Sequence, residues 1–356
     1  MYKMENLNFL KIKIARKSQR LSMDDLVSRM GDRAISKNSI SKIERGLLRP
    51  SVQTLSAIAD ACNVPLSYFY DDDMRIGKLD FRFTKDIPTK KAEQIKCLVI
   101  SEIQKYLLAE NIVCSESDNL KLSRRKLIRT YDDAENVTID LRKKLEIGYQ
   151  PIFSVYELFM NCGIHIIEVD IEDYDILGLS TFVCDSIPVI IINRNTNKTT
   201  ERKRFTALHE LAHLILNIRL LSDNDDCAEM DKYKKLPYKV TVKKATSERI
   251  CHHFAAAMLI PQNCLFKRVG HIRTKLSLEE LVSIRNMYGI SIAAIIHRCH
   301  DLAIIDDKEY NNLFDNLINK NIMETGWGGY PIMEKADRLK LLEERIKLEC
   351  INLNRI

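Results

Sequence analysis

The sequence feature that most constrains this chain is the pentapeptide His209-Glu210-Leu211-Ala212-His213. Residues four apart share one face of an α-helix, so both histidine rings can reach a single zinc ion at about 2.0 Å. A glutamate after the first histidine lies beside the metal, where it can act as base for a bound water. Apolar residues on either side predict that this helix is buried. We therefore predict a zinc site, and the alternative is a core helix with two hydrogen-bonded histidines.

Composition indicates a globular protein of a reducing compartment. With 356 residues, 46% of them apolar, the chain is long enough for two or three domains that each bury a core. The ten cysteines are scattered without a C-x-x-C pair, which suits a compartment where thiols stay reduced. The first 20 residues lack the apolar stretch of a signal peptide, and no apolar run approaches the roughly 20 residues of a membrane span. We expect a soluble, cytoplasmic protein with no membrane partner.

The net charge of +6 is concentrated near the N-terminus. Residues 1–70 hold twelve basic and six acidic residues, whereas basic and acidic residues balance over the remainder. A positive excess confined to one small module is typical of a nucleic-acid-binding domain attached to a domain with another role. A chance asymmetry of the surface is the alternative explanation.

The residue patterns divide the chain into four segments. Residues 1–70 are predicted to be a DNA-binding helical module, residues 74–136 a helical connector, residues 137–265 a domain around the zinc site, and residues 266–356 a helical C-terminal region. Runs of β-branched residues predict strands at 164–169 and 188–193. The predicted fold is α+β and mainly helical, with a five-helix N-terminal bundle followed by a domain with a small β-sheet.

The first segment has the pattern of short amphipathic helices. One is predicted over residues 7–18, a second begins after Ser22 and ends at Gly31, and a third spans about residues 38–45. The third helix keeps apolar residues inward and presents short polar and basic side chains, as a recognition helix in the DNA major groove must. The candidate DNA-contacting residues are Lys37, Asn38, Ser39 and Lys42. A helical bundle that makes only protein contacts is the alternative.

Residues 40–46 (ISKIERG) and 49–51 (RPS) resemble the signature of the phage-repressor-like (Xre/Cro) helix-turn-helix family. This resemblance implies that Glu44 pairs with Arg16 to stabilise the fold, and that the four polar residues named above face double-stranded operator DNA. Met23 departs from the pattern, because the family often has a DNA-contacting glutamine there. Such modules often read paired half-sites, which is compatible with a homodimer.

Glu248 opens a predicted helix, residues 248–261, that resembles a segment of the ImmA/IrrE metallopeptidase family. Further matches lie in the family's order between residues 141 and 206. The resemblance implies that His209, His213 and Glu248 hold one zinc ion on the thermolysin plan, with Glu210 as catalytic base. It also implies that residues 137–265 form a metallopeptidase core.

Two residues near the third ligand depart from this family. Cys251 and His252 replace the usual alanine and asparagine. His252 lies one helical turn after Glu248, where the family residue hydrogen-bonds a zinc-bound histidine, and we expect the same outer-shell role for it. Alternatively, its ring competes as a metal ligand and makes the site structural. The candidates for stabilising the oxyanion are Tyr233, Tyr238 and His271.

Together these features predict a DNA-binding transcriptional regulator whose zinc-dependent endopeptidase domain cleaves a repressor-like or antitoxin-like protein, or itself. By resemblance, the expected protein substrate is a helix-turn-helix repressor or antitoxin linked to mobile elements or stress responses. The alternative is a DNA-binding repressor or antitoxin whose zinc domain is a non-catalytic sensor or partner-binding module. The intact Glu210 favours the enzyme, since a structural zinc site does not need it. A second helix-turn-helix pattern at residues 276–298 is mostly apolar in its second helix, which favours packing on the core over DNA contact.

Overall fold

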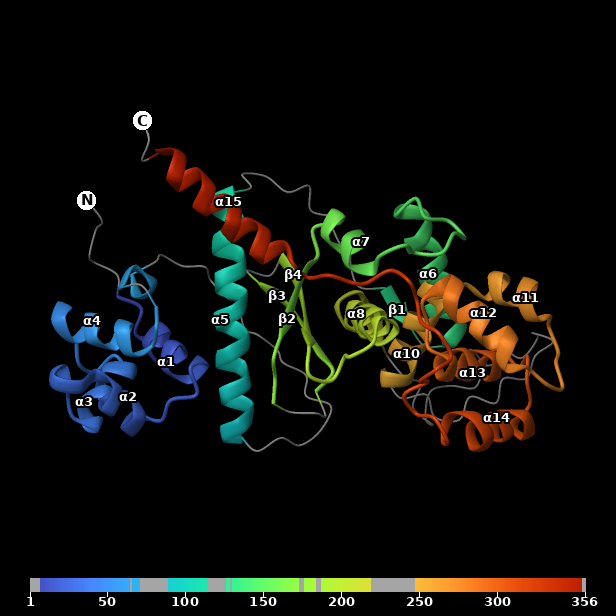
Figure 1. The fold of residues 1–356 in the computed structure, drawn as a ribbon, viewed down its shortest axis with the longest axis horizontal. Coiled ribbons are helices and arrows are strands. Elements are labelled where there is room, and N and C mark those ends of the chain that lie inside the picture. The colour runs from blue at the N-terminus through green and yellow to red at the C-terminus, as the bar shows by residue number, and fades with distance from the viewer. Residues whose placement is uncertain are drawn as a thin grey trace.

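The computed structural model describes residues 7–64, 66–70, 89–113, 126–128, 130–172, 176–183, 187–218 and 247–353. Within these residues the fold is α+β and mainly helical, as predicted. A helical module at one end of the molecule adjoins the long helix α5 (Thr89–Val113), a small sheet follows, and a second group of helices lies at the other end (Figure 1). No helix in the described segments is long and apolar enough to cross a membrane.

Four α-helices build the N-terminal module: α1 (Phe9–Ser18), α2 (Met23–Met30), α3 (Lys37–Glu44) and α4 (Val52–Ala61). Two short 3₁₀ helices, η1 (Gly31–Arg33) between α2 and α3 and η2 (Leu66–Phe69) after α4, complete the module. Side chains of Ser22, Ser36 and Ser51 cap α2, α3 and α4 by accepting hydrogen bonds from backbone N–H groups three residues on. Helix α2 ends at Gly31, whose φ of +56° glycine adopts at little cost. Because these signals are local, the predicted helix ends fall close to the observed ones.

The N-terminal module is attached to α5 by polar contacts. Lys13 and Lys17 of α1 both pair with Glu93 of α5, at 2.6 and 2.5 Å. The Tyr68 hydroxyl donates a hydrogen bond to Gln104 Oε1 of α5 at 2.9 Å. The connector predicted over residues 74–136 therefore contains a helix that supports the module directly.

The central sheet has the strand order β2-β4-β3. Its strands are β2 (His165–Val169), β3 (Gly178–Val183) and β4 (Ile187–Asn193), and β4 runs parallel to β2 and antiparallel to β3. Alternate residues of β4 face opposite sides: Val189 and Ile191 pack with α5, whereas Ile190 and Ile192 pack with α8 (Thr200–Ile215). The two strands predicted from sequence are observed, and β3 is a third strand that was not predicted.

The remaining elements surround α8. They are β1 (Lys126–Ile128), which pairs in parallel with β5 (Leu216–Ile218), and the helices α6 (Tyr131–Lys144), α7 (Val155–Asn161), α10 (Ser247–Leu259), α11 (Gln262–Val269), α12 (Leu278–Tyr288), α13 (Ile292–Asp301) and α14 (Asp307–Leu313), with the π-helical turn η3 (Phe314–Ile318). One hydrophobic cluster runs from Ile128 through α8 and α10 to Ile318. The apolar second helix of the 276–298 pattern, α13, is part of this cluster, so it packs on the core as expected.

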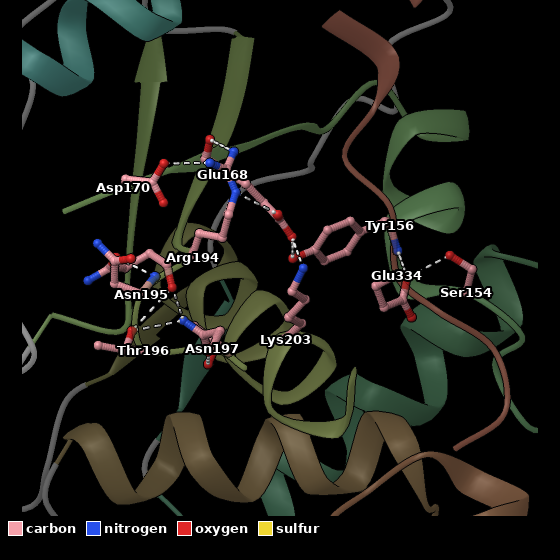
Figure 2. Close-up of polar contacts among 12 residues, drawn as sticks. Ser154, Tyr156, Glu168, Asp170, Arg194, Asn195, Thr196, Asn197, Lys203 and Glu334 are labelled. Carbon is pink, nitrogen blue, oxygen red and sulfur yellow. Dashed lines mark hydrogen bonds and ion pairs between the residues drawn. The ribbon is translucent and has the colours of Figure 1, made fainter. Parts of the chain in front are cut away.

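Residues 319–337, which we call the strap, return across the molecule to the last helix α15 (Arg338–Leu353). Glu324 accepts hydrogen bonds from the N–H groups of Ile292 and Ala293 at the start of α13. Glu334 accepts hydrogen bonds from Ser154 Oγ and the N–H of Tyr156 at the start of α7 (Figure 2). Two buried acids thus hold the strap by capping helices far away in sequence. Helix α15 then packs beside α5 (Figure 1).

A second polar cluster ties β2 to α7 and α8. The Glu168 carboxylate, at the centre of Figure 2, accepts hydrogen bonds from the Tyr156 hydroxyl at 3.1 Å and from Lys203 Nζ at 2.6 Å. Arg194 joins Glu168 to Asp170, with a 2.6 Å contact to the latter. The cluster fixes the start of α8 relative to the sheet, and with it the histidines further along the helix.

Candidate metal centre and nucleic-acid interface

The two histidines of the pentapeptide converge on one face of α8. Their Nε2 atoms lie 3.1 Å apart, and both side chains are mostly buried. The helix begins at Thr200 with Thr199 as N-cap and buries most of its last three turns. Helical spacing therefore brings the two rings together, as the sequence predicted.

Glu248, at the start of α10, completes a triangle of donor atoms. Its Oε2 lies 3.2 Å from His209 Nε2, and its Oε1 lies 3.6 Å from His213 Nε2. Four ligands arranged tetrahedrally at zinc–ligand distances of about 2.0–2.1 Å are separated by about 3.3 Å. The observed separations fit that geometry, so these three residues can hold one metal ion. Their approach depends on the packing of α10 against α8, which joins residues 35 positions apart.

The charges of the triangle suit a cation. Hydrogen bonds with His209 and His213 lower the pKa of Glu248, so its carboxylate is ionised. Burial alone would lower the pKa of His213, but hydrogen bonds with Cys251 and Glu248 outweigh it and raise that pKa to about 10. The surroundings of His213 thus favour positive charge, which a bound divalent ion supplies in place of a proton.

The outer side of the histidine pair is lined by the two residues that depart from the family pattern. Cys251 Sγ lies 3.7 Å from His213 Nδ1 and is fully buried. The His252 ring lies beside the His209 ring with 4.6 Å between centroids, and desolvation lowers the pKa of His252 to about 4. Nδ1 of His209 has no hydrogen-bond partner among the described residues, so the bond expected from His252 is absent from this arrangement. The contact of Cys251 with His213 was not predicted, because a lone cysteine in an apolar helix gives no signal of its contacts.

Glu210 is buried beside β3. The hydroxyl of Ser180 hydrogen-bonds the Glu210 side chain, but burial has the larger effect and raises the pKa of the carboxyl. Gly178 lets the strand approach this closely, because a Cβ there would lie 3.0 Å from Glu210 Cγ. A carboxyl with a raised pKa, next to a metal triangle, is suited to accept and return a proton.

The triangle opens into a cavity of about 1250 Å³. Residues of β3, α8, α10 and α13 form its walls, and the strap contributes Ile322 and Met323. Among the described strands β3 pairs only with β4, so its other edge is unpaired where the cavity lies. An unpaired edge beside a cavity can bind an extended peptide through main-chain hydrogen bonds. In the sequence, Leu179, Thr181 and Val183, which are buried in the structure, alternate with Ser180 and Phe182, and this short period-two pattern was the signal that could have predicted the strand.

The expected oxyanion partners do not join the site within the described residues. His271 stacks on Phe266, with 4.3 Å between ring centroids, and does not line the cavity. Tyr233 and Tyr238 lie outside the described residues.

In the N-terminal module, the pair inferred from the first resemblance is present. Arg16 Nε and Nη2 donate hydrogen bonds to Glu44 at 2.6 and 2.8 Å, and both side chains are buried. This bidentate contact joins α1 to the end of α3 and holds the recognition helix on the bundle. Met23, in the position of the family's glutamine, is half-buried against the core of the module.

The four candidate DNA-contacting residues of helix α3 differ in solvent exposure. Lys37, Asn38 and Lys42 are exposed, although Lys37 also pairs with Asp24 at 2.5 Å. Ser39 is half-buried, and its Oγ lies 2.9 Å from Ser36 Oγ within the N-cap. Helix α3 lies on the side of the module away from α5 (Figure 1). The described part of the chain therefore leaves the three exposed side chains accessible.

Comparison with known families agrees with this architecture. Residues 12–69 match the family model for the helix-turn-helix, and residues 160–300 match that for the IrrE N-terminal-like domain, a peptidase family. The chain thus joins a DNA-binding helix-turn-helix domain to a peptidase-like domain. Among the curated proteins compared with the chain, none matches.

Proposed function

We propose that this protein is a DNA-binding transcriptional regulator whose second domain is a zinc-dependent endopeptidase. Its substrate is a repressor-like or antitoxin-like protein, or the chain itself. The observation that carries the proposal is the convergence of His209, His213 and Glu248 at tetrahedral spacing beside a buried Glu210. We further propose a cytoplasmic protein that reads operator DNA as a homodimer.

The site residues divide the chemistry between them. When bound by His209, His213 and Glu248, a zinc ion supplies a Lewis acid for the scissile carbonyl and the attacking water. Glu210 takes a proton from that water and returns it to the leaving amine. The free edge of β3 aligns the peptide, and the cavity walls limit the access of bulk water to the bond being cleaved.

The peptidase proposal is tested by Glu210→Gln. This change keeps the volume of the side chain and removes the base, so zinc should stay near one per chain while cleavage falls about 10²- to 10⁴-fold. Zinc is measured by mass spectrometry, and cleavage is assayed on helix-turn-helix proteins encoded by neighbouring genes. Glu279→Gln, an exposed carboxylate on α12, is the matched control and should cleave like the wild type. Equal cleavage by the wild type and Glu210→Gln would contradict the proposal.

The DNA-binding proposal is tested by Lys42→Ala. Losing one phosphate contact should weaken binding to the DNA upstream of the gene and reduce the slope of log affinity against log salt by about 1. Lys340→Ala, on an exposed position of α15, is the control and should bind like the wild type. An unchanged salt slope for Lys42→Ala would exclude this residue from the interface.

A second candidate function is that of a DNA-binding repressor or antitoxin whose zinc domain is a sensor or binds a partner protein without cleaving it. The observation that favours it is the His252 ring next to His209 inside the cavity, where a third imidazole can occupy the position needed by water. Zinc near one per chain without cleavage of any neighbouring helix-turn-helix protein would support this candidate. Cleavage that is restored by His252→Asn would show that the imidazole had blocked the site.

A further inference from the structure

His297 is a histidine of the cavity wall to which the proposed reaction assigns no role. It belongs to α13, which packs against α10, and its side chain is exposed and lines the cavity. His252 of α10 lines the same cavity next to the metal triangle. Burial and the charge of His209 have the largest lowering effects on the pKa of His252, and protonation of His297 would lower it further, so the two imidazoles lie within electrostatic reach of each other. The imidazole of His297, on helix α13, thus lines the same cavity as the metal triangle.

The orientation of the His297 ring is set by Tyr310. The Tyr310 hydroxyl lies 3.0 Å from His297 Nδ1, and the ring of Phe314 packs on the histidine with 4.8 Å between centroids. His297 lines the cavity whereas Tyr310 does not, and Nε2 is the ring nitrogen on the side away from the tyrosine. Within the described part of the chain, no residue forms a hydrogen bond with that Nε2. Contacts with Tyr310 and Phe314 therefore hold the imidazole ring, whereas its Nε2 has no hydrogen-bond partner among the described residues.

The protonation states of Tyr310 and His297 determine whether Nε2 donates or accepts a hydrogen bond. Burial, aided by the charge of Asp301, raises the pKa of Tyr310, so its hydroxyl keeps the proton and can donate it to Nδ1. Partial desolvation lowers the pKa of His297 although its side chain keeps some contact with solvent, which favours the neutral imidazole at neutral pH. A neutral imidazole that accepts at Nδ1 carries its proton on Nε2. When the Tyr310 hydroxyl donates to Nδ1, Nε2 carries the proton and is the hydrogen-bond donor.

We propose that His297 Nε2–H donates a hydrogen bond to a carbonyl oxygen of the peptide bound in the cavity, and so stabilises the negative charge that develops there during cleavage. This inference rests on the proposed peptidase function and deepens it. Tyr310 acts as the positioning residue, because it fixes both the tautomer and the direction of the ring. A hydrogen-bond donor that is already oriented toward the oxygen on which negative charge develops makes one of the largest contributions of a protein to the rate of acyl transfer.

His300 provides a matched control on the same helix. It lies three residues after His297, its ring also packs on Tyr310 at 4.5 Å, and its Nε2 is 2.8 Å from Asp307. It does not line the cavity. Loss of packing in the aromatic cluster would affect both histidines, whereas loss of a donor to the peptide would affect His297 alone.

The first test reads the tautomer and needs no substrate. Full-length protein labelled with ¹⁵N at its eight histidines is studied by long-range ¹H–¹⁵N NMR, and the signal lost in His297→Ala assigns the residue. We expect the proton on Nε2 in the wild type and a mixture of tautomers in Tyr310→Phe. A proton on Nδ1 in the wild type would overturn the proposal, whatever the protein cleaves.

The second test uses peptides from a tryptic digest of a bacterial lysate, with cleavage read by mass spectrometry and kinetics measured on the best-cleaved peptide. His297→Ala should lower kcat/KM by about 100-fold with zinc content unchanged. His297→Gln, which retains an N–H donor, should recover part of that loss, and His300→Ala should match the wild type. Wild-type kcat/KM in His297→Ala, or loss of zinc in step with activity, would overturn the role. Failure of the proposed peptidase function itself would be recognised separately, because the wild type and Glu210→Gln would then yield the same peptides by mass spectrometry.

Discussion

Replacement of Glu334 tests how strongly the strap is held. Its carboxylate is fully buried and lies 2.7 Å from Arg204 Nη1, which is fully buried as well. It also accepts hydrogen bonds from Ser154 Oγ at 2.6 Å and from the N–H groups of Val155 and Tyr156 at 2.8 and 3.0 Å. Glu334→Gln keeps the shape of the side chain but leaves the arginine charge without its partner. Breaking a buried pair from one side costs about 3–5 kcal/mol of unfolding free energy.

The single tryptophan makes this loss measurable where it occurs. Trp327 lies in the strap and is half-buried against the main core, so its fluorescence reports on this segment during urea unfolding. With a urea dependence of about 2–3 kcal/mol per molar, the midpoint for Glu334→Gln should fall by roughly 1.5 M. Combining it with Arg204→Met should cost less than the sum of the two single changes, because both remove the same interaction.

Two outcomes would refute this reasoning. A midpoint shift below about 0.3 M for Glu334→Gln would mean that the ionic character of the contact contributes little. Additive effects of the Arg204 and Glu334 changes would mean that the two side chains do not depend on each other. Glu279→Gln, exposed on α12, sets the baseline and should stay within about 0.5 kcal/mol of the wild type.

Three further predictions concern the peptidase-like domain. Burial alone would raise the pKa of Glu135, but the ion pair with Arg298 and the contact with His253 outweigh it and lower that pKa to about 2 from 4.5. The contribution of Glu135 to stability is therefore complete above pH 4.5 and is lost as pH falls. The difference in unfolding free energy between the wild type and Glu135→Gln, from urea unfolding, should shrink by about 0.8 kcal/mol between pH 7 and pH 4. Cys251→Ala removes the contact to His213 Nδ1 and should weaken zinc affinity, measured by chelator competition, about 10-fold or more, with recovery in Cys251→Ser. Gly178→Ala puts a methyl group 3.0 Å from Glu210 Cγ and should slow cleavage at least 10-fold with zinc retained.

Each of these predictions has a distinct control or contrary result. If the difference in unfolding free energy between the wild type and Glu135→Gln widens as pH falls, the pKa of Glu135 is raised in the folded protein and the prediction is wrong. Cys299→Ala removes another fully buried thiol, which lies on α13 and has no hydrogen bond to His209 or His213 among the described residues, so equal zinc loss in both cysteine variants would indicate general destabilisation. Wild-type cleavage by Gly178→Ala would show that β3 and Glu210 adjust to the added methyl group at little cost.

Local and short-range features were the ones that the sequence predicted well. Capping serines and Gly31 define the helices of the N-terminal module, and the spacing of His209 and His213 requires a shared helical face. These signals act within about one turn of helix, so neighbouring residues suffice to read them. The coarse α+β fold followed from the same kind of pattern.

Contacts between distant segments account for what the sequence did not predict. The strap carries three glycines next to Trp327, namely Gly326, Gly328 and Gly329, a composition typical of a flexible segment. It is nevertheless held by Glu334 through Arg204, which lies 130 residues earlier. The pairing of His297 with Tyr310 depends on the fold of α13 and α14 rather than on a motif. Such acids, histidines and tyrosines resemble ordinary surface residues until the packing of the helices is known.

The position of α15 on α5 has a consequence for the order of folding during synthesis. The N-terminal module has its own closed hydrophobic cluster, so it can fold as soon as it leaves the ribosome. Helix α5 cannot complete its packing at that time, because its apolar face packs against β2 and β4 and because α15, which packs beside it, begins at Arg338, far later in the chain. The segment that joins the two domains is therefore among the last to mature. A nascent chain truncated before Arg338 should expose α5 to protease while the N-terminal module is already protected.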